Sequence, residues 1–275
     1  MFSNKQLPNP ARRHFLAVTA ATGRRVAALA ALAATVSLTG AKAASHSPNG
    51  PPGPVGNPNH PSCFLRGTAI QTPDGEVRIE DLRVGDLVLT VRGEAVPIRW
   101  IARHLYKKGG PSWPESVMPI RVSRDALGEG MPHSDLCLSP WHSLFIDGHL
   151  MLVRDLVNGV SIAPAMPEGM ATLEYFHILL ATHEVILAEG ALAETLVVEV
   201  DNFHESFTNF IEYERLYPGE TRLMTRFAPL ATCYGGRAEL KALFRRGVST
   251  VVDVRDPLQR ACDRIATRSL ELSSP

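Results

Sequence analysis

Short apolar runs alternate with strong turn signals through the middle of the chain. Turns such as Pro73-Asp74-Gly75, Asp147-Gly148 and Glu189-Gly190 close these runs, because glycine and aspartate adopt the backbone angles that tight turns need. Runs of this length with turns between them are typical of β-strands. The predicted strands are 68–71, 77–79, 87–91, 98–101, 120–122, 143–146, 175–180 and 185–187. The pattern predicts a compact, hairpin-rich all-β domain over residues 63–200.

Beyond residue 200 the pattern changes to a charged, helix-compatible one. In the segment 236–246, Leu240, Leu243 and Phe244 have the i, i+3, i+4 spacing of one helix face. A single apolar stripe favours a helix that packs onto another element. We therefore expect residues 201–275 to form a mainly helical C-terminal appendage on the β-domain.

The first 43 residues have the three parts of an export signal. Arg12 and Arg13 come first, an Ala-rich apolar run follows at 26–38, and Ala41-Lys42-Ala43 offers a small-residue cleavage site. The order Arg-Arg-His-Phe-Leu resembles a bacterial twin-arginine signal. An amphipathic surface helix is the alternative, but a run made mostly of alanine has no polar face. The apolar run is also shorter than the roughly 20 residues of a transmembrane helix.

The signal resemblance implies an exported protein. Its partner would be the twin-arginine export machinery, and its location the periplasm or the medium, or the inner membrane if the signal stays uncleaved. Residues 44–62 follow, rich in Pro, Gly and Asn, with Val55 as the one large apolar residue. Such a segment cannot bury enough surface to offset its ordering entropy, so we expect a flexible tether. Order is expected to begin at Cys63.

Composition narrows the function classes. Lys+Arg and Asp+Glu both number 28, so the net charge is zero and nucleic acid is not an expected partner. The 21 Gly and 21 Pro fit a turn-rich β-protein. None of the cysteines forms a Cys-x-x-Cys pair, so we expect neither a metal site nor a cofactor. In an oxidising compartment two disulfides can form, with partners that the spacing leaves open. The cysteines are Cys63, Cys137, Cys233 and Cys262.

Cys63 stands where the tether ends and the domain begins, an unusual place for a structural cysteine. The segments 63–70 (Cys-Phe-Leu-Arg-Gly-Thr-Ala-Ile) and 72–75, with Gly85-Asp86, resemble the opening block of the Hint family. This family is the autoprocessing domain shared by Hedgehog proteins and inteins. The resemblance implies a horseshoe-shaped Hint β-fold in which Cys63 is the nucleophile. It is closest to the bacterial Hint proteins that are neither inteins nor Hedgehogs.

Two further blocks follow in the family's order. Ser139-Pro140-Trp141-His142 is similar to its Thr-x-x-His block, with Ser139 at the Thr position. The segment 175–190 is similar to its penultimate strand pair and contains His183 and His177, the latter where many inteins carry Asp. The blocks cover about half of the chain. The catalytic residues that the resemblance implies are Cys63, His142, Ser139, His177 and His183.

The implied chemistry is self-cleavage at the Ser62–Cys63 bond. A free thiol has a pKa of about 8.5, and its thiolate can attack the carbonyl of Ser62 to give a thioester, an N-to-S acyl shift. An imidazole with a pKa of about 6.5 suits His142 as the acid that protonates the departing nitrogen, with Ser139 as hydrogen-bonding helper. A nucleophile then opens the thioester. The N-terminal segment of the chain is thus an intramolecular substrate.

Splicing is not expected, because it needs a terminal Asn, usually preceded by His, and no His-Asn pair occurs in the chain. Where an intein would end, the sequence reads 190–195 (Gly-Ala-Leu-Ala-Glu-Thr) and continues. Cleavage in the cytoplasm would remove the export signal, so we expect cleavage after export.

Other interpretations stay open. The chain is alternatively a Hint-fold binding or structural module without activity, or a cysteine hydrolase acting on other molecules if trimming frees Cys63 as the N-terminus. His142, His177 and His183 are alternatively structural histidines bonded to the backbone. Cys137 is more plausibly a small core residue than a resolving thiol.

Overall fold

A computed structural model describes residues 62–110, 112–165, 171–199, 203–220, 222–231 and 256–273. All of them belong to one compact unit, Asn49–Pro275. The expected signal peptide 1–43, the tether up to residue 61, Cys233 and the expected helix 236–246 lie outside the described residues. Among the residues that are described, no helix is both long and apolar enough to span a bilayer.

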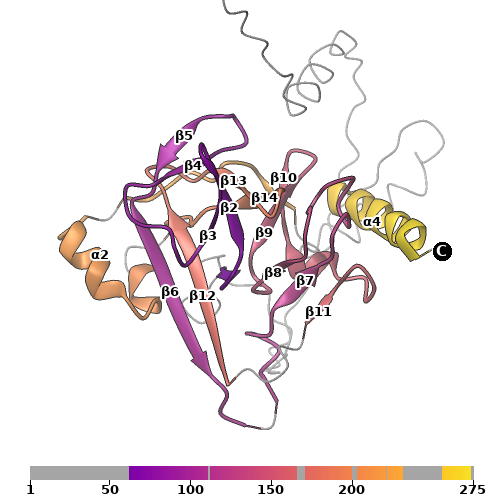
Figure 1. The fold of residues 1–275 in the computed structure, drawn as a ribbon, viewed down its shortest axis with the longest axis horizontal. Helices are drawn as coiled ribbons and strands as arrows, with labels where there is room; N and C mark the ends of the chain where they lie inside the picture. The colour runs from indigo at the N-terminus through magenta and orange to yellow at the C-terminus, as the bar shows by residue number, and fades with distance from the viewer. Residues whose placement is uncertain are drawn as a thin grey trace, which may run out of the picture. The chain divides into compact units, whose positions relative to one another are not determined.

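Two large β-sheets dominate the fold (Figure 1). The six-stranded sheet runs in the order β11 (Ile162–Pro164), β7 (Ile120–Val122), β8 (Leu136–Leu138), β1 (Phe64–Leu65), β12 (Thr172–Leu179), β6 (Trp100–Lys107). The seven-stranded sheet runs in the order β15 (Leu230–Ala231), β10 (His149–Leu152), β9 (Ser143–Ile146), β14 (Ala191–Glu194), β13 (Val185–Ala188), β2 (Ala69–Thr72), β3 (Gly75–Arg78). A small hairpin joins β4 (Leu87–Leu89) to β5 (Ala95–Pro97). The expected all-β fold class is confirmed.

Several strands were not predicted from the sequence. They are β1, β5, β8, β10, β11, β14 and β15. Most residues of β10 and β14 are buried, so these two strands lack the alternation that marks a half-buried strand. Conversely, the predicted strand 98–101 overlaps only the start of β6, since residues 98–99 connect β5 to β6. Turn signals located the hairpins better than apolar periodicity located the strands.

The short strand β1 separates two apolar clusters. Phe64 belongs to a cluster that includes Leu138 and Phe176, whereas Cys63 belongs to one that includes Trp100 and Tyr175. Successive residues of a strand point to opposite faces, which explains the division. The register of β1 is fixed on both sides, because Phe64 pairs with Phe176 on β12 and with Leu138 on β8. Cys63 is therefore held at the centre of the six-stranded sheet.

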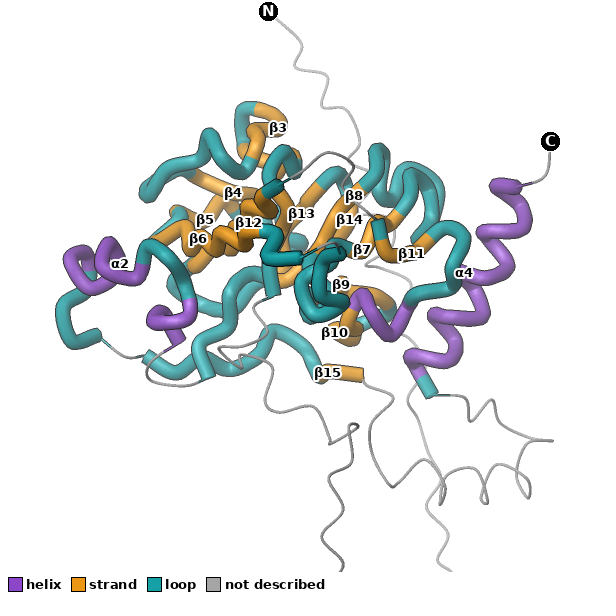
Figure 2. Tube along the Cα trace, turned by 90° about the horizontal axis from the view of Figure 1, so that it is seen from below, coloured by secondary structure: helices purple, strands orange, loops and turns teal. Residues whose placement is uncertain are grey.

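The described C-terminal residues include helices, as expected, but these helices pack against separate parts of the β-domain (Figures 1 and 2). Helix α2 (Phe210–Leu216) and the 3-10 helix η2 (Phe203–Ser206) lie beside β6, where the Tyr213 ring is 5.2 Å from that of Trp100. Helix α4 (Pro257–Ser273) packs against the 3-10 helix η1 (Val153–Leu156). Its Arg264 forms a 2.7 Å ion pair with Asp147. The seven-stranded sheet also gains β15 from this part of the chain, parallel to β10.

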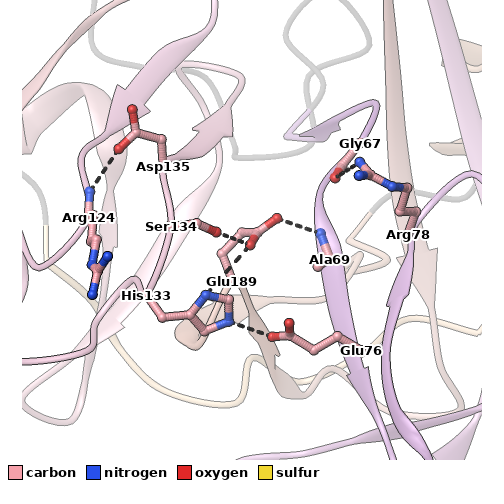
Figure 3. A network of polar contacts seen from close by, with 9 residues as sticks. All are labelled: Gly67, Ala69, Glu76, Arg78, Arg124, His133, Ser134, Asp135 and Glu189. Atoms are coloured by element: carbon pink, nitrogen blue, oxygen red, sulfur yellow. Dashed lines mark hydrogen bonds and ion pairs between the residues drawn. The ribbon is translucent and has the colours of Figure 1, made fainter.

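A polar network anchors the turn between β13 and β14 (Figure 3). Glu189 accepts hydrogen bonds from the backbone N–H of Ala69, at 2.7 Å, and from the Ser134 hydroxyl. His133 lies between Glu189, at 3.9 Å, and Glu76, at 2.6 Å. Because these bonds tie the turn to β2 and to the loop before β8, the hairpin β13–β14 is held firmly. The last residue of that hairpin, Glu194, is part of the site described next.

Candidate active site

Ser139 holds both backbone groups of Cys63. The Cys63 N–H donates to the Ser139 hydroxyl at 2.7 Å, and the Ser139 N–H donates to the Cys63 carbonyl at 2.9 Å. This clamp follows from strand pairing, because Ser139 comes directly after Leu138, the residue of β8 that pairs with Phe64. The nitrogen of the Ser62–Cys63 bond is therefore in contact with a hydroxyl group, and Cys63 itself is fully buried.

His177 lies on the other side of the same peptide bond. The register that pairs Phe64 with Phe176 brings Cys63 level with His177 on β12. Nδ1 of His177 is 3.4 Å from the hydroxyl oxygen of the half-buried Ser62. The ring of His177 is fully buried. An imidazole thus borders the residue whose carbonyl the sequence analysis expects to be attacked.

His142 is buried on the Phe64 face of β1. It ends the turn that begins at Ser139, since its N–H donates to the Ser139 carbonyl at 3.1 Å. Its ring lies 4.3 Å from the Phe64 ring and 5.1 Å from the His177 ring, centre to centre. Among the described residues, none meets hydrogen-bond geometry with either ring nitrogen of His142 or with Nε2 of His177. These nitrogens are available to take part in proton transfer.

Glu194 completes the cluster, and the sequence analysis did not select it. Its Oε1 accepts the Ser143 N–H at 2.9 Å, and its Oε2 lies 3.5 Å from Nε2 of His183. The side chains of Glu194 and His183 are fully buried. The Nδ1 atom of His183 in turn accepts the backbone N–H of Phe227 at 3.0 Å. The site therefore contains three histidines and one carboxylate.

The carboxylate is ionised. Burial acts to raise the pKa of Glu194, but the hydrogen bond with His183 and the charges that His142, His183 and His177 can carry lower it to about 2. An ionised carboxylate in the protein interior needs such partners to offset the water it has lost.

The thiol and the imidazoles are neutral at rest. Burial raises the pKa of the Cys63 thiol well above its ordinary value. Burial lowers the pKa of His142 to about 4, although Glu194 acts to raise it, and lowers the pKa of His177 well below the ordinary value. The pKa values of free side chains predict some thiolate and a partly protonated His142. In the folded chain the Cys63 thiol and the His142 ring are instead both neutral.

Cys137 lies away from this cluster. It pairs with Arg121 across β7 and β8 and is only partly buried, so it is not the small core residue that the sequence favoured. Burial and the nearby Asp135 raise the pKa of its thiol to about 11. The three described cysteines, Cys63, Cys137 and Cys262, form no disulfide with one another. In the described segments, no cluster of three or more His, Cys, Asp or Glu has the arrangement of a metal site.

Fold and site together define a β-protein in which a buried cysteine directly precedes the first strand and histidines cluster nearby. The Hint domain family matches residues 62–200, half of the chain, and the chain belongs to this family. The fold of this family supports autoprocessing in general. No curated protein matches the chain.

Part of the chain is similar to several solved inteins. The chain is 17% identical to the gp41-1 intein, with a TM-score of 0.35 over 48% of this chain and 98% of the intein. It is 10% identical to a DnaB intein from Synechocystis sp. PCC 6803, with a TM-score of 0.37 over 50% of this chain and 100% of the intein. It is 15% identical to the MchDnaB-1 intein, with a TM-score of 0.33 over 47% of this chain and 98% of the intein.

Acid is expected to unfold the protein through its buried histidines. His142 has a pKa of about 4 in the folded chain and an ordinary value of 6.5, so the unfolded chain binds more protons below pH 6.5. Stability is therefore fully present above pH 6.5 and is lost as the pH falls towards 4, with a loss from His142 of about 2 kcal/mol at pH 5. His177 adds a loss of the same sign.

Urea unfolding at pH 7.5 and pH 5 measures this loss. The His142→Gln variant is expected to lose less stability between these pH values than the native chain, whereas His149→Gln, at a partly exposed ring, is expected to match the native chain. Equal acid sensitivity of the His142→Gln variant and the native chain would contradict the assignment.

Proposed function

We propose that this chain cleaves itself at the Ser62–Cys63 bond through an N-to-S acyl shift. One observation carries the proposal: the Cys63 nitrogen contacts the Ser139 hydroxyl at 2.7 Å while Ser62 contacts His177 at 3.4 Å. The nitrogen of this peptide bond therefore faces a hydroxyl group, and the side chain of Ser62, whose carbonyl would be attacked, faces an imidazole. A bond with only a structural purpose does not need two such groups, because one hydrogen bond satisfies its N–H.

The proposed first step moves one proton and exchanges one bond. The proton of the Cys63 thiol passes to the neutral His142–His177 pair by way of His177, which the strand register brings level with Cys63, and the sulfur attacks the carbonyl carbon of Ser62. As the carbon–nitrogen bond breaks, the imidazolium returns the same proton to the Cys63 nitrogen, next to the Ser139 hydroxyl. The chain gains and loses no atoms in this step, because the thioester is an isomer of the starting peptide.

Burial supports the roles of the histidines. Because the pKa of His142 is about 4, the ring is unprotonated and a weak base at neutral pH, and once protonated it is a strong acid towards the departing nitrogen. The amide is more stable than the thioester, since amide resonance is lost in the attack. The reaction therefore goes forward only when water or another nucleophile opens the thioester.

We further propose that the protein is exported, that cleavage follows export, and that no splicing occurs. The twin-arginine-like segment at Arg12 and Arg13 supports export. The segment 190–195 carries Glu194-Thr195 in place of a His-Asn pair, so the Asn cyclisation that splicing requires has no residue to perform it. The product would be a domain that begins at Cys63, separated from the segment that ends at Ser62.

Intact-mass analysis of the full chain tests these proposals. Cytoplasmic and periplasmic fractions are treated separately with hydroxylamine or with dithiothreitol at neutral pH. We expect a fragment 63–275 in the periplasmic fraction and, with hydroxylamine, a second fragment that carries a hydroxamate on Ser62. The chain with Arg12→Lys and Arg13→Lys is expected to stay in the cytoplasm. An unchanged mass in every sample would exclude self-cleavage and favour the binding module.

A further inference from the structure

Phe227 reaches the histidine cluster from outside the region that the Hint family matches. The match ends at residue 200, whereas the Phe227 N–H donates to Nδ1 of His183 at 3.0 Å. His183 is buried, and its other ring nitrogen faces Glu194. A backbone group of the C-terminal part is thus in contact with a histidine of the site.

This contact determines where the His183 ring carries its proton. A neutral imidazole has one donor nitrogen and one acceptor nitrogen, and Nδ1 is the acceptor because it receives the Phe227 N–H. The proton therefore lies on Nε2. That nitrogen is 3.5 Å from the ionised carboxylate of Glu194, and the two atoms do not reach hydrogen-bond geometry, so the proton lies on the nitrogen nearest to a negative charge. In the other tautomer a lone pair of the ring would face the carboxylate.

The segment that carries Phe227 is fixed to the sheet that carries Glu194. Strand β15 pairs with β10 through Leu230 and Leu150, and β10 pairs with β9, whose first residue Ser143 donates its N–H to Glu194. The Phe227 ring also lies 5.5 Å from that of Phe145 on β9 and 4.6 Å from the Arg92 guanidinium carbon. The N–H of Phe227 is therefore held in place from several sides.

We infer that the C-terminal segment 222–231 is part of the reaction site, with Phe227 as a positioning residue that fixes the tautomer of His183 through its backbone N–H. This inference rests on the proposed self-cleavage. His183 in turn orients the Glu194 carboxylate, which lies among the histidines that transfer the proton. Without the Phe227 N–H, the His183 ring loses its preference for the Nε2 proton, the Glu194 carboxylate loses that nearby proton, and the cleavage slows.

The tautomer is measured directly by nitrogen-15 NMR of histidine side chains. The full chain with Cys63→Ala is used because it stays uncleaved, so the measurement does not depend on activity. We expect the His183 shifts of a neutral ring protonated on Nε2. Shifts of the Nδ1-protonated ring overturn the inference even if cleavage is observed. Conversely, if His183 is protonated on Nε2 but the native chain never cleaves, the tautomer assignment stands and only the proposed function is refuted.

A matched pair of substitutions separates the N–H from the ring. Phe227→Leu removes the aromatic ring and keeps the N–H, whereas Phe227→Pro removes the N–H as well. We expect Phe227→Pro to cleave about tenfold more slowly than Phe227→Leu, the equivalent of about 1.4 kcal/mol, and to show both tautomers of His183. Thermal unfolding of both variants identifies any general loss of structure. Equal rates and equal tautomers in two folded variants would overturn the inference.

Discussion

The Cys63→Ala variant is expected to remain a single chain under every condition that cleaves the native protein. Cys63 supplies the only sulfur in the proposed bond exchange, so its loss removes the nucleophile and no thioester can form. Intact mass after hydroxylamine treatment measures the result. The fold should persist, because removing one buried sulfur costs about 1 kcal/mol, a small part of the 5–15 kcal/mol that typically stabilises a domain.

Two controls make this result specific. Cys137→Ala removes a partly exposed thiol from β8, at the position that pairs with Arg121 on β7. This variant should cleave at the native rate. Cys63→Ser keeps a nucleophile of similar size, but a hydroxyl is far less acidic than a thiol, so cleavage should be much slower. Fragments from the Cys63→Ala chain that begin at residue 63 would show that another protease cuts the bond.

Glu194→Gln is expected to lower the free energy of unfolding by about 1–3 kcal/mol at neutral pH, because a buried acceptor beside His183 is replaced by a neutral amide. Its carboxyl group has a pKa of about 2 in the folded chain and an ordinary value of 4.5, so the site favours the charged form over a neutral group of the same shape. Glutamine is such a neutral group. It can still accept the Ser143 N–H, which leaves the lost charge as the main difference.

The pH dependence distinguishes this effect from a packing defect. A depressed pKa contributes stability that is present above pH 4.5 and is lost as the pH falls towards 2. The difference between the native chain and Glu194→Gln should therefore shrink over that range in urea or thermal unfolding. Glu174→Gln is the control, because Glu174 forms an exposed ion pair with Arg66 and such pairs contribute about 0–1 kcal/mol. A Glu194→Gln deficit that stays constant with pH would contradict the proposed charge.

The order of the sequence blocks was enough to identify the fold class. Gly-containing turns and the Cys63, Ser139-to-His142 and His177 blocks depend on local patterns, so they can be read without knowledge of contacts. The same patterns did not locate β10 or β14, because almost all residues of these strands are buried and no alternation marks them. Nor did they show that Cys137 is partly exposed, because exposure depends on packing between strands that are distant in the sequence.

Glu194 and Phe227 could be found only in three dimensions. Glu194 ends an ordinary-looking Ala-Leu-Ala-Glu run, and its contacts with His183 and Ser143 join three separate parts of the chain. Phe227 acts through its backbone N–H, a group that every residue except proline has. No side-chain pattern marks it.

The sequence by itself determined which reactive groups the chain has, in what order, and that they belong to a hairpin-rich Hint fold. This is possible because residue type and turn chemistry are local properties. Only the tertiary structure decided the protonation states of Cys63 and His142, because the pKa of a buried group depends on the water it has lost and the charges around it. Both come from residues that are distant in the chain, such as Glu194, and they meet only when the two sheets have formed.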